Sequence, residues 1–327
     1  MRYPASHLAR SVALAVSLLA AGSASAEQHV VLYSANDDTV NKLVSDGFAK
    51  ATGIKVDVVS TGSGVLVRRI TSEAANPQGD VIWGVSATIL RLASPYLQPY
   101  QAKEREAVPA QFRDPGDLWL GTNIQVVVIG QNTKAIDKAS GPKSWADLLD
   151  PKWKGKLVKG HPGYSGAILT ATFLIVRELG WAYLEKLAQQ RVMQVQSAAD
   201  PPKKVQVGER AVMADGNDYS LILLKDQGHQ VEVVYPTEGS PLVTVHNGVF
   251  RSAPNPNAAR LFQSYMFSAE AQQVFLDVFA HRSLHAQVKE KPGRTPLSAI
   301  KILRADPAAV LKQTEEIKAR YARIFGV

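Results

Sequence analysis

The sequence contains no cysteine among its 327 residues. Disulfides, thiolate zinc sites, iron–sulfur clusters, cysteine nucleophiles and lipid attachment to an N-terminal cysteine all require the sulfur atom, so each is excluded. No apolar run reaches the roughly 20 residues that a membrane-spanning helix needs. The composition is 46% hydrophobic and 20% charged, which is typical of a folded protein, and the length predicts about two domains at roughly 150 residues each.

The N-terminal segment has the pattern of a secretory signal peptide. A basic stretch, residues 2–10, precedes an apolar one, residues 11–22, and Ala24-Ser25-Ala26 provides the small residues of a cleavage site. We expect residues 1–26 to be removed, with an uncleaved N-terminal anchor as the alternative. Losing the two arginines of this segment lowers the formal net charge from +8 to +6. An exported basic protein is expected to meet small anions or an anionic surface rather than nucleic acid.

Strand-like and helix-like segments alternate along the rest of the chain, which predicts an α/β protein. Apolar runs, continuous or alternating, predict strands at residues 29–33, 54–60, 80–83, 124–129, 156–159, 231–235 and 242–250. Apolar residues at helical spacing predict helices at residues 39–52, 65–75, 165–179, 181–190, 219–227, 257–267, 269–279 and 307–323. Strands that alternate with helices at this spacing are expected to pair in parallel.

Two strongly apolar segments, 124–129 and 242–250, enclose the middle of the chain. They suggest that the chain crosses to a second lobe and returns, although both could also be ordinary strands of one larger sheet. Each lobe is expected to be a mixed sheet flanked by helices, and clefts between such lobes close around ligands. We predict lobe 1 at residues 27–123 plus 249–327, lobe 2 at residues 124–248, and hinges near residues 122–126 and 244–249.

Three groups of motifs carry a resemblance to a known family. They are Gly62-Ser63-Gly64 with residues 80–84 (DVIWG), residues 144–156 (SWADLLDPKWKGK), and residues 253–259 (APNPNAA) with residues 268–272 (SAEAQ). In this order they resemble the family 1 extracellular solute-binding proteins of bacterial ABC importers, in the branch with ferric-, phosphorylated-sugar- and phosphonate-binding members. The resemblance implies a two-lobed type 2 periplasmic binding protein. It would be monomeric, without catalytic activity or cofactor, and would deliver a small ligand to an inner-membrane ABC permease.

Two loops are the best candidates for binding an anion. Thr61-Gly62-Ser63-Gly64 stands between a predicted strand and helix, where glycines let backbone N–H groups approach an anion and the helix dipole favours negative charge. It lacks the third glycine of a dinucleotide-binding loop and the Lys-Ser/Thr of a P-loop, which argues against nucleotides. Residues 161–166 (HPGYSG) precede a second helix in the same way. We therefore expect Ser165, Gly166 and Ala167 to complete a site for an organophosphate, phosphonate or carboxylate.

The other candidate ligand-binding residues stand near ends of predicted strands or starts of predicted helices: Ser34, Trp83, Tyr164, Asp215 and Tyr219. Ser34 follows the first strand, and open α/β sheets bind ligands at the carboxyl ends of their strands. A role at the start of the next helix is the alternative for Ser34. The rings of Trp83 and Tyr164 would either line the cleft or belong to the core.

Two other functions stay open. The ferric binders that the chain resembles hold iron with two adjacent tyrosines, and here Tyr219 matches one while Ser220 replaces the other. Asp218 could supply a further oxygen ligand, so ferric iron is the alternative cargo. Around Ser165 the sequence is similar to the Gly-x-Ser-x-Gly elbow of hydrolases, but Ala167 replaces the last glycine. An exported serine hydrolase is therefore the less favoured alternative.

Two features of the C-terminal region are not expected to bind the ligand. His281 and His285 are four residues apart but lack the intervening glutamate of a zinc-protease helix, so we expect surface or loop positions for them. The mixed charges of the helix at residues 307–323 predict a solvated face, with the rest of the helix packed on the first lobe.

Overall fold

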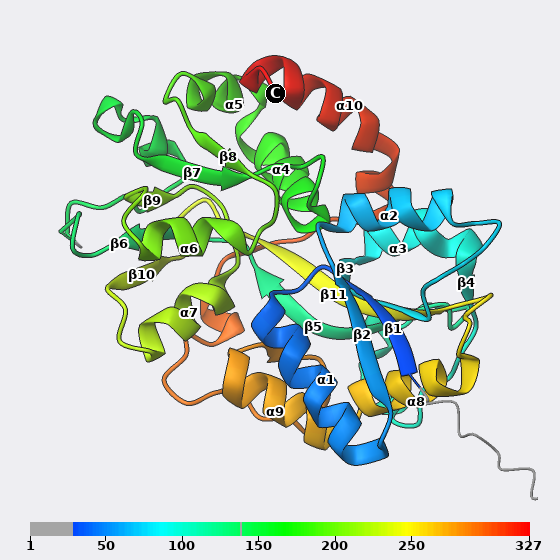
Figure 1. Cartoon of the computed structure of the whole chain (residues 1–327). Coiled ribbons are helices and arrows are strands. Elements are labelled where there is room, and N and C mark those ends of the chain that lie inside the picture. The colour runs from blue at the N-terminus through cyan, green and yellow to red at the C-terminus, as the bar shows by residue number, and fades with distance from the viewer. Residues whose placement is uncertain (1–28, 138) are drawn as a thin grey trace, which may run out of the picture.

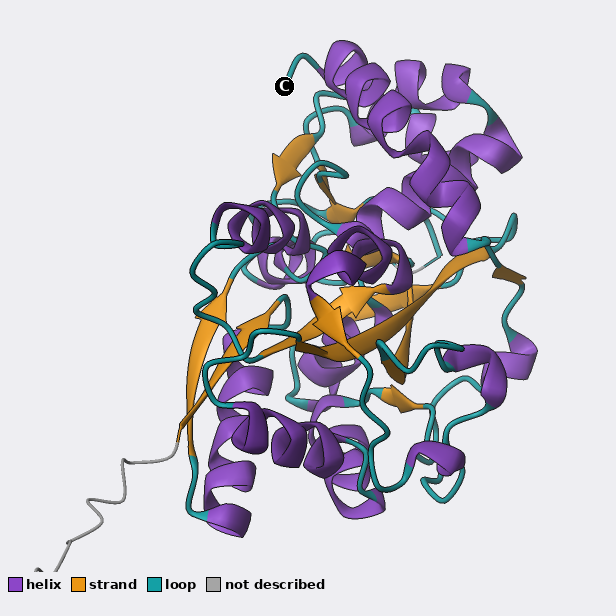
Figure 2. Ribbon diagram, turned by 90° about the vertical axis from the view of Figure 1, so that its right-hand side faces the viewer, coloured by secondary structure: helices purple, strands orange, loops and turns teal. Residues whose placement is uncertain are grey.

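The computed structural model describes residues 29–137 and 139–327, so the predicted signal peptide, residues 1–26, lies outside the described residues. Two β-sheets, each flanked by helices, build two lobes (Figures 1 and 2). The predicted α/β class and the two-lobed architecture are confirmed.

The sheet of the first lobe is mixed. Its strands follow the order β12-β5-β11-β3-β1-β2, and β4 and β13 also pair with β11. The expected parallel pairing is found where β1 lies between β2 and β3, because helices connect these strands. β11 returns from the second lobe and runs antiparallel to β3 and β5. The bounds are β1 His29–Ser34, β2 Lys55–Ser60, β3 Val81–Ser86, β4 Leu97–Gln98, β5 Leu120–Val126, β11 Ser240–Phe250, β12 Arg282–Ser283 and β13 Ile302–Leu303.

Amphipathic helices cover this sheet. In α1, Val40, Val44 and Phe48 recur every four residues and are buried, and the helix ends where Gly53 adopts a left-handed conformation with φ of 75°. The bounds of the helices of this lobe are α1 Asp38–Thr52, α2 Ser63–Ser72, α3 Ala87–Ala93, α8 Pro256–Met266 and α9 Ala269–Phe279. α3 begins directly after β3, and α2 begins after the two residues that follow β2, so the N-terminal ends of both helices lie at the carboxyl edge of the sheet.

The second lobe has a smaller sheet in the order β10-β6-β9-β7-β8. The bounds of its strands are β6 Ile129–Asn132, β7 Leu157–Gly160, β8 Met193–Val195, β9 Val212–Met213 and β10 Val231–Val234. Its helices are α4 Gly166–Leu179, α5 Trp181–Ala188, α6 Asp200–Gln206 and α7 Asp218–Asp226. Across residues 29–137 and 139–327 no single helix is long and apolar enough to cross a membrane; α4 and α5 reach that size only as a pair bent by 110°.

The chain passes between the sheets twice. It leaves the first sheet at the end of β5 and, after two intervening residues, enters the second sheet at β6. It returns to the first sheet between β10 and β11. The single strand predicted at residues 124–129 therefore covers the end of β5 and the start of β6. The predicted hinge ranges, 122–126 and 244–249, lie within β5 and β11, and where the lobes pivot stays a prediction.

The C-terminal helix α10 (Pro307–Phe325) contacts both lobes. It packs against α3 of the first lobe and against α4 and α5 of the second (Figure 1). Tyr321, which is fully buried, joins the core cluster of the second lobe, and Val310 and Ile317 pack with Leu169 of α4. The expected packing on the first lobe is found at α3, and the apolar side of the helix also faces α4 and α5 of the second lobe.

Candidate functional site

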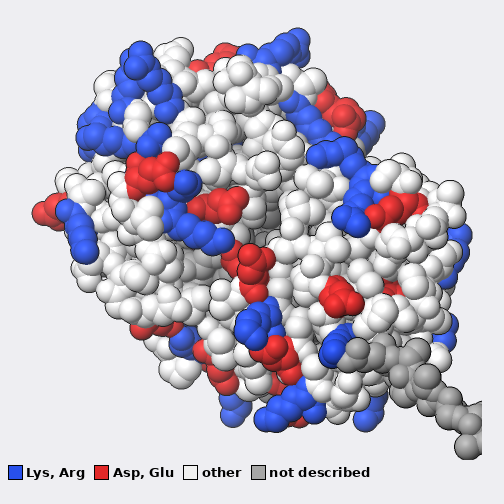
Figure 3. Space-filling model, in the orientation of Figure 1, with Lys and Arg blue, Asp and Glu red and all other residues white. Residues whose placement is uncertain are grey.

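A small cavity lies between the lobes, where the N-terminal ends of α2, α3, α4, α6 and α7 come together. Its volume is about 20 Å³, room for about one water molecule, so the lobes must part slightly to hold any larger ligand there. The face drawn in Figure 3 is hollowed between the lobes, and most of the surface there is uncharged. The polar side chains in the cavity lining belong to Ser63, Ser86, Gln125, Ser165, Ser197 and Asn217.

The electrostatics of this cavity favour an anion. Within the described ranges, no Lys, Arg, His, Asp or Glu lines it. The first N–H groups of a helix have no intrahelical acceptor, and the helix dipole places partial positive charge there. Ser86 Oγ, which can donate to an anion, and Asn217 Oδ1, which can only accept from a ligand N–H or O–H, are also buried without a hydrogen-bond partner among the described residues. Because an unpartnered buried polar atom costs about 1–3 kcal/mol, a polar ligand would relieve this cost.

In the first predicted loop, residues 61–64, some residues line the cavity and others contact the opposite lobe. Gly62 and Ser63 line the cavity. Ser63 Oγ also accepts a hydrogen bond of 2.8 Å from the N–H of Gly166, and the N–H of Gly64 donates to the carbonyl of Tyr164 at 3.0 Å. Thr61, the residue before Gly62, does not belong to the cavity lining. Gly64 therefore lies in the contact between the lobes.

The second predicted loop provides the other wall. Ser165 and Ala167 line the cavity. Ser165 caps α4, since its Oγ accepts the N–H of Ile168 at 3.4 Å. The ring of Tyr164 does not line the cavity; it packs against His161, with 5.0 Å between ring centroids, and lies under the guanidinium of Arg68.

Ser34 and Trp83 lie beside the cavity but point away from it. Ser34 Oγ donates to Asn41 Oδ1 at 2.6 Å in the interior, and Trp83 packs on Phe275 in the core. Their next residues in the chain, Ala35 and Gly84, line the cavity instead. Successive side chains of a strand point to opposite faces. The sequence located the end of β1 to within one residue, whereas β3 continues to Ser86, three residues beyond the predicted end.

Asp215 is part of a buried ion pair behind the cavity. Its carboxylate lies 3.0 Å from Lys159 Nζ and accepts the N–H of Gly160 at 2.8 Å. Lys159 Nζ also donates to the hydroxyl of Tyr321, at 2.9 Å. Burial alone would lower the pKa of Lys159, but the charge of Asp215 and the Tyr321 hydroxyl outweigh it and raise the pKa. The structure thus connects Asp215 to α10 and does not place it in the cavity lining.

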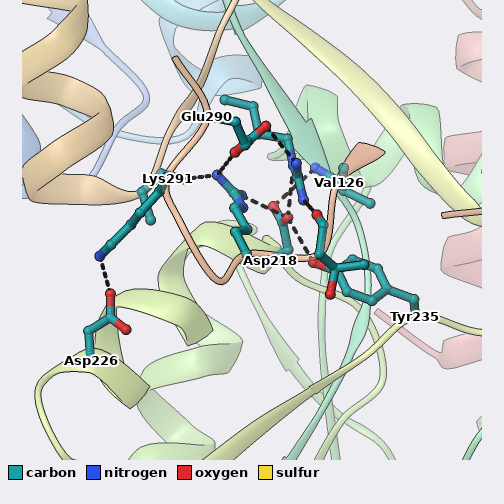
Figure 4. Close-up of polar contacts among 10 residues, drawn as sticks. Val126, Asp218, Asp226, Tyr235, Glu290 and Lys291 are labelled. Carbon is teal, nitrogen blue, oxygen red and sulfur yellow. Dashed lines mark hydrogen bonds and ion pairs between the residues drawn. The ribbon is translucent and has the colours of Figure 1, made fainter. Parts of the chain in front are cut away.

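The two residues of the iron alternative are also engaged in the interior. Asp218 is completely buried, and its Oδ2 lies 2.9 Å from Arg294 Nη2 and 3.5 Å from Arg282 Nε (Figure 4). Tyr219 is buried with its ring perpendicular to that of His281, at 4.5 Å between centroids. Burial raises the pKa of the Tyr219 hydroxyl. Neither residue belongs to the cavity lining.

Several lining residues were not predicted. Asn217 and Ser86 directly precede α7 and α3, and a Ser or Asn before a helix is a recognisable capping signal. That signal could have indicated both. Gln125 lies within β5 and Ser197 in a loop before α6, and no local pattern distinguishes them from other polar residues.

The two C-terminal histidines lie outside helices and strands, which is one of the two positions expected for them, but they are buried and not on the surface. His281 and His285 are 1% and 3% exposed. His285 Nε2 lies 3.1 Å from a carboxylate oxygen of Glu104, whereas His281 Nε2 has no partner in the described part of the chain. Burial, with a smaller contribution from the charge of Arg294, lowers the pKa of His281 to about 3.

We expect His281 to make the protein sensitive to acid. The unfolded pKa of histidine is about 6.5, so the unfolded chain binds a proton at a pH where folded His281 stays neutral. The contribution of the neutral, buried His281 side chain to the free energy of unfolding is complete above pH 6.5 and is lost as the pH falls toward 3. By pH 4.5 the loss is about 3 kcal/mol. In urea titrations at pH 7 and pH 4.5, His281→Gln should lose less stability between the two pH values than the wild type does, and an equal loss would contradict this role of His281.

Comparisons with known proteins agree with this geometry. Residues 86–299 match a family model described as bacterial extracellular solute-binding protein. A Salmonella typhimurium protein, provisionally named a 2-aminoethylphosphonate-binding periplasmic protein, is 30% identical over 281 residues, which is 81% of each chain. Iron uptake protein A2 of Synechocystis sp. is 27% identical over 286 residues, covering 81% of this chain and 80% of that protein.

Solved structures show the same fold. The periplasmic binding protein AfuA from Actinobacillus pleuropneumoniae, with fructose-6-phosphate bound, has a TM-score of 0.85 at 22% identity and covers 92% of this chain and 99% of its own. Iron-bound HitA from Pseudomonas aeruginosa has a TM-score of 0.76 at 24% identity, covering 91% and 99%. The chain therefore belongs to the bacterial extracellular solute-binding proteins, the components that capture solutes for ABC importers.

Proposed function

We propose that this protein binds a small organophosphate or organophosphonate between its lobes and presents it to an inner-membrane ABC permease. The observation that carries the proposal is the uncharged cavity at which five helix N-termini meet. Such a site binds phosphate and related oxyanions through N–H and O–H donors, without a cationic side chain. The fructose-6-phosphate in AfuA and the name of the Salmonella relative support the same ligand class.

Both lobes contribute donors to the proposed site. The α2 and α3 ends, with Ser63 and Ser86, come from the first lobe, and the α4, α6 and α7 ends come from the second. A ligand that contacts both lobes favours the closed state over the open one. We propose that the protein catalyses no reaction, because no acid or base side chain of the described residues lines the cavity beside Ser165.

We propose that the protein acts in the periplasm as a freely diffusing monomer. The support is the pattern of residues 1–26, the absence of cysteine for lipid attachment, and the periplasmic names of relatives. Protein recovered from a periplasmic fraction should begin at Glu27.

A thermal-shift screen of that purified protein tests the ligand class. We expect 2-aminoethylphosphonate, fructose 6-phosphate or methylphosphonate to raise the melting temperature, since a ligand at a hundredfold excess over its Kd stabilises the folded state by about 2.7 kcal/mol. Ser86→Asp, which adds a negative charge to the cavity, should abolish the shift. The matched change at an exposed serine, Ser298→Asp, should leave it unchanged.

Two results of the same screen would contradict the proposal. Simple carboxylates alone raising the melting temperature would assign the cavity to a different anion class. Ferric citrate producing a coloured tyrosinate complex, with no shift from any phosphorus oxyanion, would instead establish iron as the cargo.

A further inference from the structure

The lobes meet in a seam of backbone beside the cavity, formed by residues 62–64 of the first lobe and residues 163–166 of the second. The N–H of Gly64 donates to the carbonyl of Tyr164 at 3.0 Å. A Cβ atom on Gly62 would lie 2.7 Å from the carbonyl oxygen of Tyr164, and one on Gly64 would lie 2.7 Å from that of Gly163. Because both clashes are with backbone of the opposite lobe, only glycine permits this closed arrangement.

Ser63 lies in the seam and also lines the cavity. Its Oγ accepts the N–H of Gly166, the first residue of α4, at 2.8 Å. A serine hydroxyl carries one donor hydrogen as well as its acceptor lone pairs. Among the residues that the structure describes, Ser63 Oγ donates to no recorded acceptor. Its hydrogen is therefore available to a ligand in the cavity.

We propose that Ser63 couples ligand binding to lobe closure. Its O–H donates to an anionic oxygen of the ligand, while its oxygen accepts the N–H of Gly166 from the opposite lobe. Donation to an anion polarises the hydroxyl and strengthens the hydrogen bond that it accepts. The ligand thereby strengthens the hydrogen bond between Ser63 of the first lobe and Gly166 of the second. This coupling rests on the proposed function, because it requires an anionic ligand. The backbone contacts of the seam involve protein atoms alone.

A second contact between the lobes serves as a control. Lys203 of α6 pairs with Asp37, which precedes α1, at 3.1 Å. The lysine side chain is 60% exposed, and neither residue lines the cavity. Removing this pair with Lys203→Met should weaken closure slightly, with or without ligand, because no hydroxyl connects the pair to the cavity.

The absence of native cysteine allows closure to be measured directly. Lys42→Cys on α1 and Val207→Cys after α6 place one spin label on each lobe at exposed sites. Methylphosphonate and inorganic phosphate serve as probes. In the labelled wild type, a probe that binds should shorten the distance between the labels. Ser63→Ala should bind the same probe about tenfold more weakly and keep an open population at saturation. Ser63→Thr, which retains the hydroxyl, should restore both properties.

The outcomes separate the coupling from the ligand class. If Ser63→Ala closes completely at saturation and binds within twofold of the wild type, the coupling is refuted. If the wild type binds no phosphorus oxyanion, the proposed function fails, and the coupling that rests on it fails too. If the wild type binds a probe and closes, Gly64→Ala must give longer distances than the wild type at saturation, because its Cβ would meet the carbonyl oxygen of Gly163; equal distances refute the seam. A loss of closure in Lys203→Met as large as in Ser63→Ala would also refute a special role for Ser63.

Discussion

Replacing Asp218 with alanine is expected to destabilise the protein by about 3–5 kcal/mol, because it leaves two buried arginines with Glu290, whose side chain is 39% exposed, as their remaining carboxylate in the described part of the chain. Asp218 is 0% exposed, and the side chains of Arg294 and Arg282 are 1% and 3% exposed. Asp218 Oδ1 also accepts the N–H of Val126, at the end of β5, at 3.3 Å (Figure 4). The carboxylate thus joins α7 of the second lobe to β5 and to the C-terminal segment of the first.

Urea denaturation with a matched control measures this effect. Asp226, eight residues along α7, pairs with Lys291, but its side chain is 44% exposed. Asp226→Ala should therefore cost less than about 1 kcal/mol. Asp218→Asn, which keeps the shape but loses the charge, should fall between the two alanine variants. Equal losses for Asp218→Ala and Asp226→Ala would show that the buried cluster carries no special stability.

The order of strands and helices could be predicted because local patterns determine most of it. The four-residue spacing of Val40, Val44 and Phe48 and the glycine at position 53 indicated the last residue of α1 and came within one residue of its first. The passage between the lobes could not be located in the same way. Val127 and Val128 separate β5 from β6 but are as apolar as both strands, so the pattern contains no signal for the break.

Part of the lining of the candidate cavity could be predicted where backbone features define it. Gly62, Ser63, Ser165 and Ala167 were selected because they begin helices, and all four line the cavity. Side chains that are defined by distant partners were assigned less well. The partner of Asp218, Arg294, is 76 residues away in the sequence. A carboxylate near a predicted cleft looks the same in the sequence whether it binds a ligand or a buried guanidinium.

The buried pair of Lys159 and Asp215 should be the second large determinant of stability. The lysine and aspartate side chains are 3% and 2% exposed. Lys159→Met removes the cation but leaves the carboxylate in the interior, with the N–H of Gly160 as its remaining donor in the described part of the chain. We expect a loss of about 3–5 kcal/mol in the free energy of unfolding. Lys152→Met, at an exposed pair with Asp150, should cost less than about 1 kcal/mol.

The double variant Lys159→Met/Asp215→Leu distinguishes a structural aspartate from one that binds ligand. Replacing a buried ion pair by apolar side chains is often close to neutral, so the double variant should recover most of the stability lost in Lys159→Met. The double-mutant cycle should give a coupling of about 2 kcal/mol or more. Because Asp215 does not line the cavity, the refolded double variant should still bind its phosphorus oxyanion with near wild-type affinity. A stable double variant that no longer binds the phosphorus oxyanion would show that Asp215 takes part in ligand binding.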